Sequence, residues 1–142
     1  MAASDIVLAV DGTQCCFSEV RLGLAPAVIS HFVAQKVRPS DMSRYFLTAE
    51  VFGPAEAQAM GLVHQYGRES EIEAELIKLT KKIKNNSPQA VKATKALIEQ
   101  LKTSSDSKKL TTDLIADLRV SDEGQEGLKA FFEKRKPNWI EG

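Results

Sequence analysis

The fold is decided by the stretch Phe17-Ser-Glu-Val-Arg-Leu-Gly-Leu-Ala-Pro26. It places one carboxylate, Glu19, between a short apolar segment and a loop over residues 23–27, where glycine and proline mark a turn. We expect the backbone at Glu19 to be extended, so that Glu19 and Arg21 lie on the same face of a strand. Taken by itself, this arrangement predicts a surface ion pair worth at most about 1 kcal/mol.

The segment before this stretch predicts a small sheet. Asp5-Ile-Val-Leu-Ala-Val10 is a nearly continuous apolar run, typical of a strand that is buried on both faces. Asp11-Gly12 marks a turn, and residues 13–17 predict a second short strand. The first strand needs a covering layer on each side, and nothing before it supplies one. We therefore expect the isolated chain to aggregate or to fold only in part unless a partner covers this strand.

The segment after the stretch is dominated by helical patterns. Ser70 and Ser87 are expected to cap helices, and residues 62–66 predict a last short strand. There is too little strand for a complete α/β sheet, so either the fold is α-rich or the sheet has been cut. Apolar spacing and capping signals predict helices over residues 28–37, 41–48, 54–60, 70–84, 88–101, 110–118 and 121–136.

Composition excludes several classes of protein. The chain has 142 residues, with 19 Lys and Arg against 19 Asp and Glu, so no net charge drives it toward nucleic acid or an anionic membrane. No apolar run is long enough for a membrane span or a signal peptide. Cys15 and Cys16 are adjacent and resemble neither a disulfide framework nor a metal site. We expect a cytoplasmic protein without a bound metal.

A run of lysines is the one local departure from this balance. Between Lys78 and Lys109 there are nine lysines and only two acids, Glu99 and Asp106. A solvated helix face is the favoured interpretation, and an anion site for phosphate groups is the alternative. An RNA-binding module is a further alternative, but no aromatic residue interleaves the lysines to stack on bases. We therefore expect no nucleic-acid partner.

The opening stretch belongs to a set of five segments that occur in order along nearly the whole chain. Together they resemble the C-terminal half of the enoyl-CoA hydratase/isomerase (crotonase) family. The run over residues 21–30, together with residues 45–50, is most similar to the methylglutaconyl-CoA hydratase branch. The five segments are Asp5-Ile-Val-Leu-Ala, Phe17 to Pro26, Arg44-Tyr-Phe-Leu-Thr, Ala55-Glu-Ala-Gln-Ala-Met-Gly-Leu-Val63 and Glu126-Gly-Leu-Lys-Ala-Phe-Phe-Glu-Lys-Arg-Lys-Pro137.

This resemblance implies an α/β fold of repeated ββα units, closed by C-terminal helices that associate as trimers. Here the fold would be truncated to its last strands and the helical region, and would be α-rich. Residues 1–67 would form the last part of the crotonase core, and residues 68–142 a helical trimerisation region. The implied substrate is an acyl-CoA thioester, so that coenzyme A is part of the substrate rather than a separate cofactor. The implied partners are copies of the chain, as a trimer or hexamer, or a missing N-terminal half.

The resemblance also implies a site. In this family two glutamates hold and split a water across the substrate double bond, and the second of them falls at Glu19, which could give a proton to the α-carbon. Gly23, Pro26 and Ala27 would line the acyl pocket, although the family's glycine-rich run after the proline is replaced here by Ala27-Val-Ile-Ser30. Lys134 would reach the phosphates of coenzyme A.

The other parts of the family's site fall outside the chain. The first glutamate and both backbone N–H donors to the thioester oxygen belong to the half of the family that is not matched. Losing one such donor costs roughly a hundred- to a thousandfold in rate, so the chain alone is expected to be inactive. The alternative is a non-catalytic oligomerisation module of the same fold, and hydratase and isomerase chemistry are not distinguished.

Overall fold

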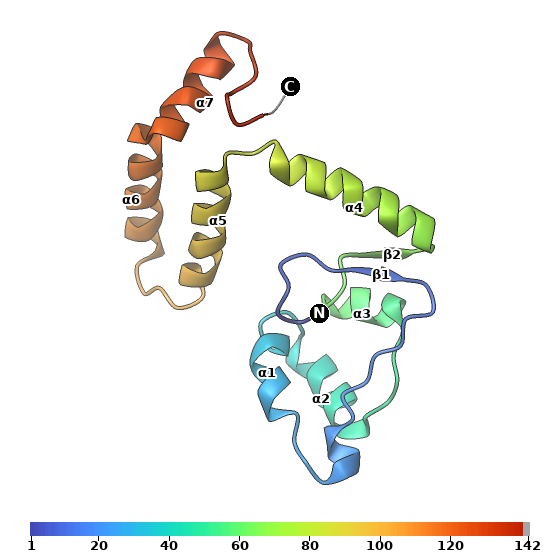
Figure 1. Ribbon diagram of the computed structural model, residues 1–142. Helices are drawn as coiled ribbons and strands as arrows, with labels where there is room; N and C mark the ends of the chain where they lie inside the picture. Colours follow the sequence, from blue (N-terminus) through green and yellow to red (C-terminus); the bar gives the residue numbers. More distant parts are fainter. Residues whose placement is uncertain (141–142) are drawn as a thin grey trace. The chain divides into compact units, whose positions relative to one another are not determined.

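The computed structural model describes residues 1–140, which form seven α-helices, a short 3-10 helix and two strands. Backbone contacts divide the chain within α4, into unit 1 (residues 1–77) and unit 2 (from residue 78). The helix-rich composition expected from the sequence is confirmed. In chain order the elements are β1 (Leu8–Val10), η1 (Glu19–Leu22), α1 (Ala27–Val33), α2 (Pro39–Thr48), α3 (Pro54–Met60), β2 (Gln65–Gly67), α4 (Glu69–Lys84), α5 (Pro88–Leu101), α6 (Ser107–Val120) and α7 (Asp122–Phe132) (Figure 1).

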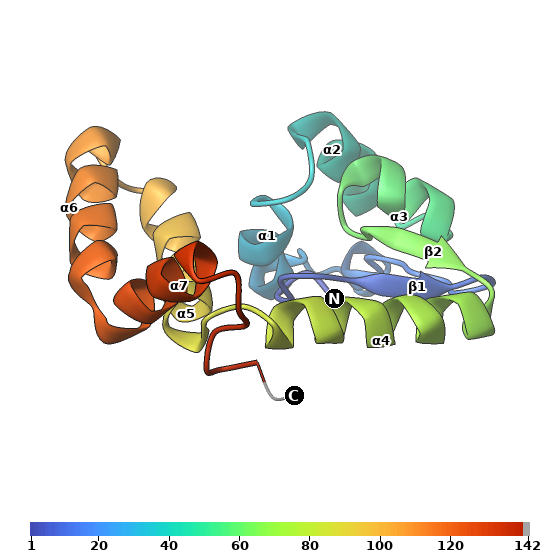
Figure 2. The same cartoon turned by 90° about the horizontal axis from the view of Figure 1, so that it is seen from above.

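The sheet of unit 1 is a single parallel pair of strands. β1 pairs with β2 in a register that sets Ala9 opposite Tyr66. In Figures 1 and 2 the pair runs between α3 and the first half of α4. The prediction of a first strand buried on both faces is wrong at its end, because Val10 is 37% exposed. Residues 13–17 do not form a strand and make only one bridge, between Cys15 and Phe52.

The core of unit 1 lies among β1, α1, α2 and α3. Leu62 and Val33 are the largest side chains that are entirely buried, and Tyr45 and Phe52 pack edge to face with their ring centroids 4.8 Å apart. This core is small and mostly aliphatic, as a low aromatic content predicts. The whole cluster consists of Ala2, Val7, Ala9, Val33, Val37, Tyr45, Phe52, Ala57, Met60, Leu62 and Val63.

α3 has the boundaries that its sequence signals predict. Pro54 occupies the first helical position, and the Glu56 carboxylate accepts a hydrogen bond from the Gly53 N–H at 3.0 Å. Gly61 ends the helix at a φ of 91°. A Cβ at this position would lie 2.8 Å from the Lys36 carbonyl oxygen, so glycine is required both by the backbone angle and by the close approach of the chain.

The two preceding helices differ from the sequence predictions at their ends. α1 stops at Val33, although the apolar spacing continues to Val37, because the chain turns and the Lys36 and Val37 N–H groups both bond to the Val33 carbonyl. α2 begins at Pro39, two residues before the expected start at residue 41, because proline suits the first helical position. The first difference arises from backbone hydrogen bonds and the second from the proline ring. Apolar periodicity carries no information about either.

Unit 2 is built on contacts among α5, α6 and α7. The Ser87 hydroxyl accepts a hydrogen bond from the Ala90 N–H at the start of α5, as the sequence predicts, and also donates to the Glu123 carboxylate of α7. Ser121 caps α7 by accepting from the Gly124 N–H at 3.1 Å. Trp139 folds back from the tail, where its indole N–H donates to the Asn85 carbonyl at 3.3 Å.

Candidate functional site around Glu19

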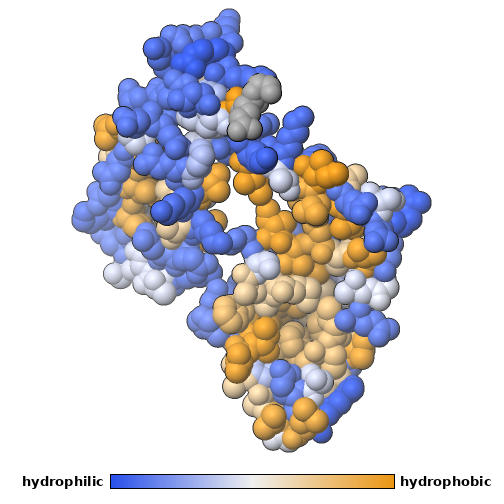
Figure 3. All heavy atoms as spheres, in the orientation of Figure 1, coloured by the Kyte–Doolittle hydropathy of each residue, from blue (hydrophilic) through white to orange (hydrophobic). Residues whose placement is uncertain are grey.

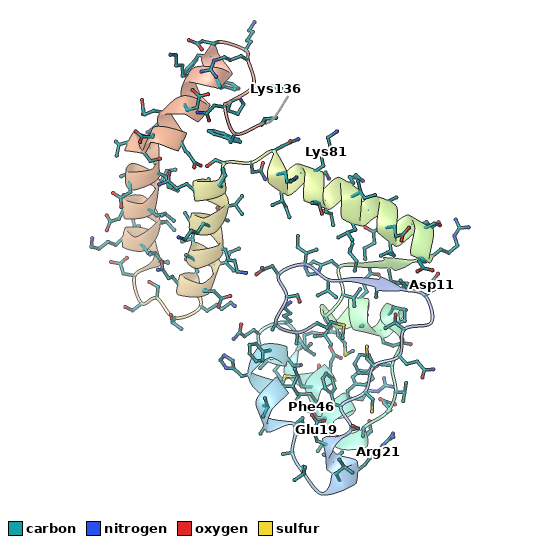
Figure 4. The ribbon with its side chains drawn as sticks, viewed as in Figure 1. Asp11, Glu19, Arg21, Phe46, Lys81 and Lys136 are labelled. Atoms are coloured by element: carbon teal, nitrogen blue, oxygen red, sulfur yellow. The ribbon has the colours of Figure 1, made fainter. Side chains whose placement is uncertain are left out.

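Glu19 begins η1, a 3-10 helix of four residues, and not the strand that the sequence predicts. The helix ends at Gly23, whose N–H bonds to the Val20 carbonyl, and the Leu24 N–H bonds back to the Glu19 carbonyl at 3.1 Å. η1 contacts α2 (Figure 4). In a 3-10 helix, residues two apart do not share a face. The prediction that Glu19 and Arg21 lie on one strand face is therefore wrong.

The Glu19 side chain has a carboxylate oxygen that is buried and has no hydrogen-bond partner. This oxygen, Oε2, is enclosed by protein atoms, and no donor among residues 1–140 reaches it. An unsatisfied buried polar atom costs about 1–3 kcal/mol, so native proteins keep few of them. Each one that persists needs an explanation, and a catalytic role is one that recurs. Glu19 carries such an oxygen.

Arg21 does not pair with Glu19. Its guanidinium turns instead to α2, where Nη2 donates to the Ala49 carbonyl oxygen at 2.5 Å. The expected surface ion pair between Arg21 and Glu19 is accordingly absent from the described residues. The Glu19 carboxylate is left without a cation, and η1 is joined to the end of α2.

The Ala49 carbonyl belongs to a turn that is held from several sides. Ala49 has no exposed surface and adopts the left-handed conformation at a φ of 50°, as the C-cap of α2. Its N–H bonds to the buried Tyr45, and Arg44 pairs with Glu50 across the turn. The Thr48 hydroxyl accepts a hydrogen bond from the Glu50 N–H at 3.2 Å. These bonds hold the turn in place, and Arg21 joins η1 to it.

Aromatic rings join the segment just before Glu19 to α2. Phe17 packs edge to face on Phe46, with ring centroids 4.7 Å apart, and lies 5.5 Å from Phe52. Phe46 also lines an open hollow of about 500 Å³ on the surface of unit 1. Figure 4 shows Glu19 and Phe46 at the same end of this unit. The other residues that line the hollow are Ala34, Pro39, Met42, Ser43 and Leu47.

The surface at this end of unit 1 is strongly apolar (Figure 3). Leu22 of η1 is 75% exposed, and Leu24, which follows it, is 62% exposed. Leu47 of α2 and Val28 of α1 are 77% and 88% exposed. A large exposed apolar patch commonly marks a binding site, whereas single exposed apolar side chains need no such explanation. The region around Glu19 therefore suits a ligand or partner with apolar groups.

The structure places the expected pocket residues directly after η1. Gly23 is the left-handed C-cap at a φ of 73°, and no atom lies within 4 Å of the Cβ that another residue would have there. Pro26 is buried, and Ala27 is exposed at the start of α1. These residues follow Glu19 on one continuous segment. Their role as a pocket wall remains a prediction.

Lys134 belongs to unit 2, whereas Glu19 belongs to unit 1. Lys134 follows α7, is exposed, and has a positive φ of 53°. The predicted contact between Lys134 and phosphate is not tested. In the lysine run, Lys81 and Lys82 are exposed on α4, in agreement with a solvated helix face (Figure 4).

Residues 1–140 contain neither a cluster of metal ligands nor a membrane-spanning helix. No group of three or more His, Cys, Asp and Glu side chains gathers there as metal ligands would. No helix in this part of the chain is long and apolar enough to cross a bilayer.

Sequence reasoning overlooked the residues that hold η1. Ala49 gives no signal in a sequence, since an alanine in the left-handed conformation is uncommon and its carbonyl is used through the backbone. The cluster of Phe17, Phe46 and Phe52 could have been suspected, because two of these rings, Phe17 and Phe46, lie within the quoted segments of a chain that has few aromatic residues. Which of these rings pack against one another becomes known only from the fold.

Comparisons with known proteins show which proteins this chain resembles. Enoyl-CoA hydratase domain-containing protein 3, mitochondrial, of Mus musculus is 33% identical over 148 residues, which cover 98% of this chain and 47% of that protein. Mevalonyl-coenzyme A hydratase of Aspergillus fumigatus is 27% identical over 149 residues, covering 98% and 53%. The crystal structure of an enoyl-CoA hydratase from Shewanella pealeana matches with a TM-score of 0.90 at 38% identity, covering 97% of this chain and 52% of that chain.

The chain thus spans about half the length of the relatives that it matches. The likeness in fold agrees with the α-rich crotonase-type architecture expected from the sequence. The family model described as enoyl-CoA hydratase/isomerase matches residues 1–142. Since this match extends over the whole chain, the chain belongs to the enoyl-CoA hydratase/isomerase family.

Proposed function

We propose that this chain is part of an acyl-CoA hydratase-type lyase in which Glu19 transfers the proton at the α-carbon of an α,β-unsaturated thioester. The observation that supports this proposal is the buried Glu19 oxygen without a hydrogen-bond donor. A carboxyl oxygen that no donor among residues 1–140 engages is free to exchange a proton with a substrate. The apolar side chains exposed around it would exclude water from the reacting carbons.

The proposed chemistry adds water across the double bond. The protonated carboxyl of Glu19 gives its proton to the α-carbon, while the family's first glutamate takes a proton from water as the water oxygen bonds to the β-carbon. The negative charge that develops on the thioester oxygen is held by two backbone N–H groups. Transfer of one proton from the first glutamate to Glu19 through water then restores both carboxyl groups.

Only part of this machinery lies in the chain described here. The resemblance assigns the family's first glutamate and both N–H donors to the half of the family that the chain does not match. They would come from further residues of the same polypeptide or from another chain. Lys134 would bind a phosphate of coenzyme A, and association of several copies would complete the protein.

A branched, six-carbon acyl group, with a methyl branch on a five-carbon chain, is the proposed substrate. The run over residues 21–30 is most similar to the methylglutaconyl-CoA hydratase branch, and a relative named for mevalonyl-coenzyme A covers almost the whole chain. We propose 3-methylglutaconyl-CoA as the acyl thioester. Straight-chain crotonyl-CoA is the comparison that would reveal a preference for the branched group.

The test is hydration of both thioesters by the protein at its native length, followed by the ultraviolet absorbance of the conjugated thioester. Glu19→Gln keeps the size of the side chain and is expected to lower the rate by roughly a hundredfold or more. Glu73→Gln, on the exposed face of α4, is the matched control and should leave the rate unchanged. A native-length protein with no turnover would favour the non-catalytic oligomerisation module.

A further inference from the structure

η1 has few contacts of its own that could hold it in place. It is four residues long, buries none of its residues, and receives no side-chain cap from Ser18. Its large apolar side chains, Val20 and Leu22, are 36% and 75% exposed, so hydrophobic burial contributes little to its position. The placement of Glu19 on α2 therefore depends on polar contacts made by neighbouring side chains.

Two side chains that flank Glu19 in the sequence bond to the same atom. The Cys16 thiol donates to the Ala49 carbonyl oxygen at 3.1 Å, and the Arg21 guanidinium donates to it at 2.5 Å. A thiol is a weak donor, whereas a guanidinium is permanently charged and makes a strong, charge-assisted hydrogen bond. Arg21 is the stronger of the two tethers.

Resting on the function proposed above, we propose that Arg21 is the positioning residue of Glu19. Its hydrogen bond fastens η1 to the turn at Ala49, and this turn is fixed by the buried Tyr45 and by the pair between Arg44 and Glu50. The tether holds η1, which carries Glu19, at the end of α2 without donating to the Glu19 carboxylate. The guanidinium thereby orients the carboxylate and leaves its buried oxygen unpaired.

The first test needs no catalytic activity. Amide hydrogen exchange is measured by NMR at Gly23 and Leu24, whose N–H groups close η1. Arg21→Met should speed exchange at these two amides by about tenfold, the effect of losing one such hydrogen bond. Exchange at Leu62 and Val63 in the core should not change. Arg21→Lys, which keeps a cationic donor, should recover part of the protection.

Two further variants separate this tether from a general loss of contacts. Arg38→Met removes an exposed arginine that pairs with Asp41 at 2.8 Å and should leave exchange at Gly23 and Leu24 unchanged. Cys16→Ala removes the weaker donor to Ala49 and should have a smaller effect than Arg21→Met. Equal exchange at Gly23 and Leu24 in the wild type and in Arg21→Met overturns the inference.

The second test is kinetic. Arg21→Met should lower kcat by roughly ten- to a hundredfold with little change in KM, because a displaced carboxylate impairs proton transfer more than binding. If Glu19→Gln keeps full activity, the proposed function fails. If Glu19→Gln is inactive but Arg21→Met keeps both its kcat and its amide protection, only the positioning role fails.

Discussion

Glu126 and Arg135 form a two-pronged ion pair that folds the C-terminal tail back onto α7. The two guanidinium nitrogens of Arg135 lie 2.6 Å and 2.8 Å from the two carboxylate oxygens of Glu126. Glu126 also accepts a hydrogen bond from the Asn138 N–H at 3.0 Å. The bond to Arg135 is the main cause that lowers the pKa of Glu126 from 4.5 to about 2.

Because of this lowered pKa, the stability of unit 2 depends on pH. A carboxyl whose pKa is lower in the folded state stabilises the fold above its unfolded value and loses that contribution as the pH falls. Glu126→Gln should therefore be less stable than the wild type at pH 7. The difference should shrink as the pH falls from 4.5 to about 2, the range between the two pKa values of Glu126.

The measurement for this pair is urea unfolding of both proteins at several pH values, with Glu73→Gln as the control carboxyl. A difference between wild type and Glu126→Gln that stays constant down to pH 2 would contradict the assignment to this ion pair.

The two serines predicted to cap helices should respond differently to removal of their hydroxyl groups. Ser87 accepts from the Ala90 N–H at 3.0 Å, so Ser87→Ala should lower the free energy of unfolding by about 1 kcal/mol. Ser70 lies inside α4, which begins at Glu69, so Ser70→Ala should be nearly neutral. Thermal and urea unfolding of both variants checks this contrast, and equal losses would contradict it.

The turn after η1 should tolerate asparagine better than alanine. Gly23 has a φ of 73° with open space at its Cβ position, so only the backbone angle opposes a side chain. Gly23→Ala should cost about 1 kcal/mol in the free energy of unfolding. Gly23→Asn should cost less, because asparagine enters the left-handed region more readily. The prediction fails if asparagine is the more damaging residue in chemical unfolding.

Self-association should depend on the aromatic end of α7. Phe131 and Phe132 are both 77% exposed and lie edge to face with centroids 5.8 Å apart. If the proposed homo-oligomer forms through this surface, replacing both with serine should shift the protein toward monomer in sedimentation velocity. Val51→Ser, which removes a side chain of unit 1 that is 53% exposed, is the control. An unchanged distribution in the double variant would rule out this surface.

Much of the secondary structure was predictable from short-range signals. Pro54 and Gly61 delimit α3, and Ser87 with Pro88 begins α5, because each of these residues acts through its own backbone geometry or its own side chain. The strands were less predictable. Residues 13–17 have the composition of a strand, but a strand exists only where a partner lies alongside, and Phe52 supplies a single bridge.

Of the candidate site, the position of Glu19 was predictable from the sequence, whereas the contacts around it were not. Glu19 was singled out through the quoted stretch and the resemblance that it carries. The conformation of η1, the unpaired oxygen and the turn of Arg21 toward Ala49 all depend on how α2 packs against η1. Such contacts between distant parts of a chain cannot be obtained from local pattern, which is why an ion pair with Arg21 was expected instead.

The central claim is that Glu19 transfers the proton at the α-carbon. The most direct measurement is exchange of that proton in heavy water, followed by mass spectrometry of the hydroxyacyl thioester incubated with the native-length protein. The account predicts deuterium at the α-carbon with the wild-type protein and with Glu73→Gln, and almost none with Glu19→Gln. Exchange by Glu19→Gln at the wild-type rate would contradict it.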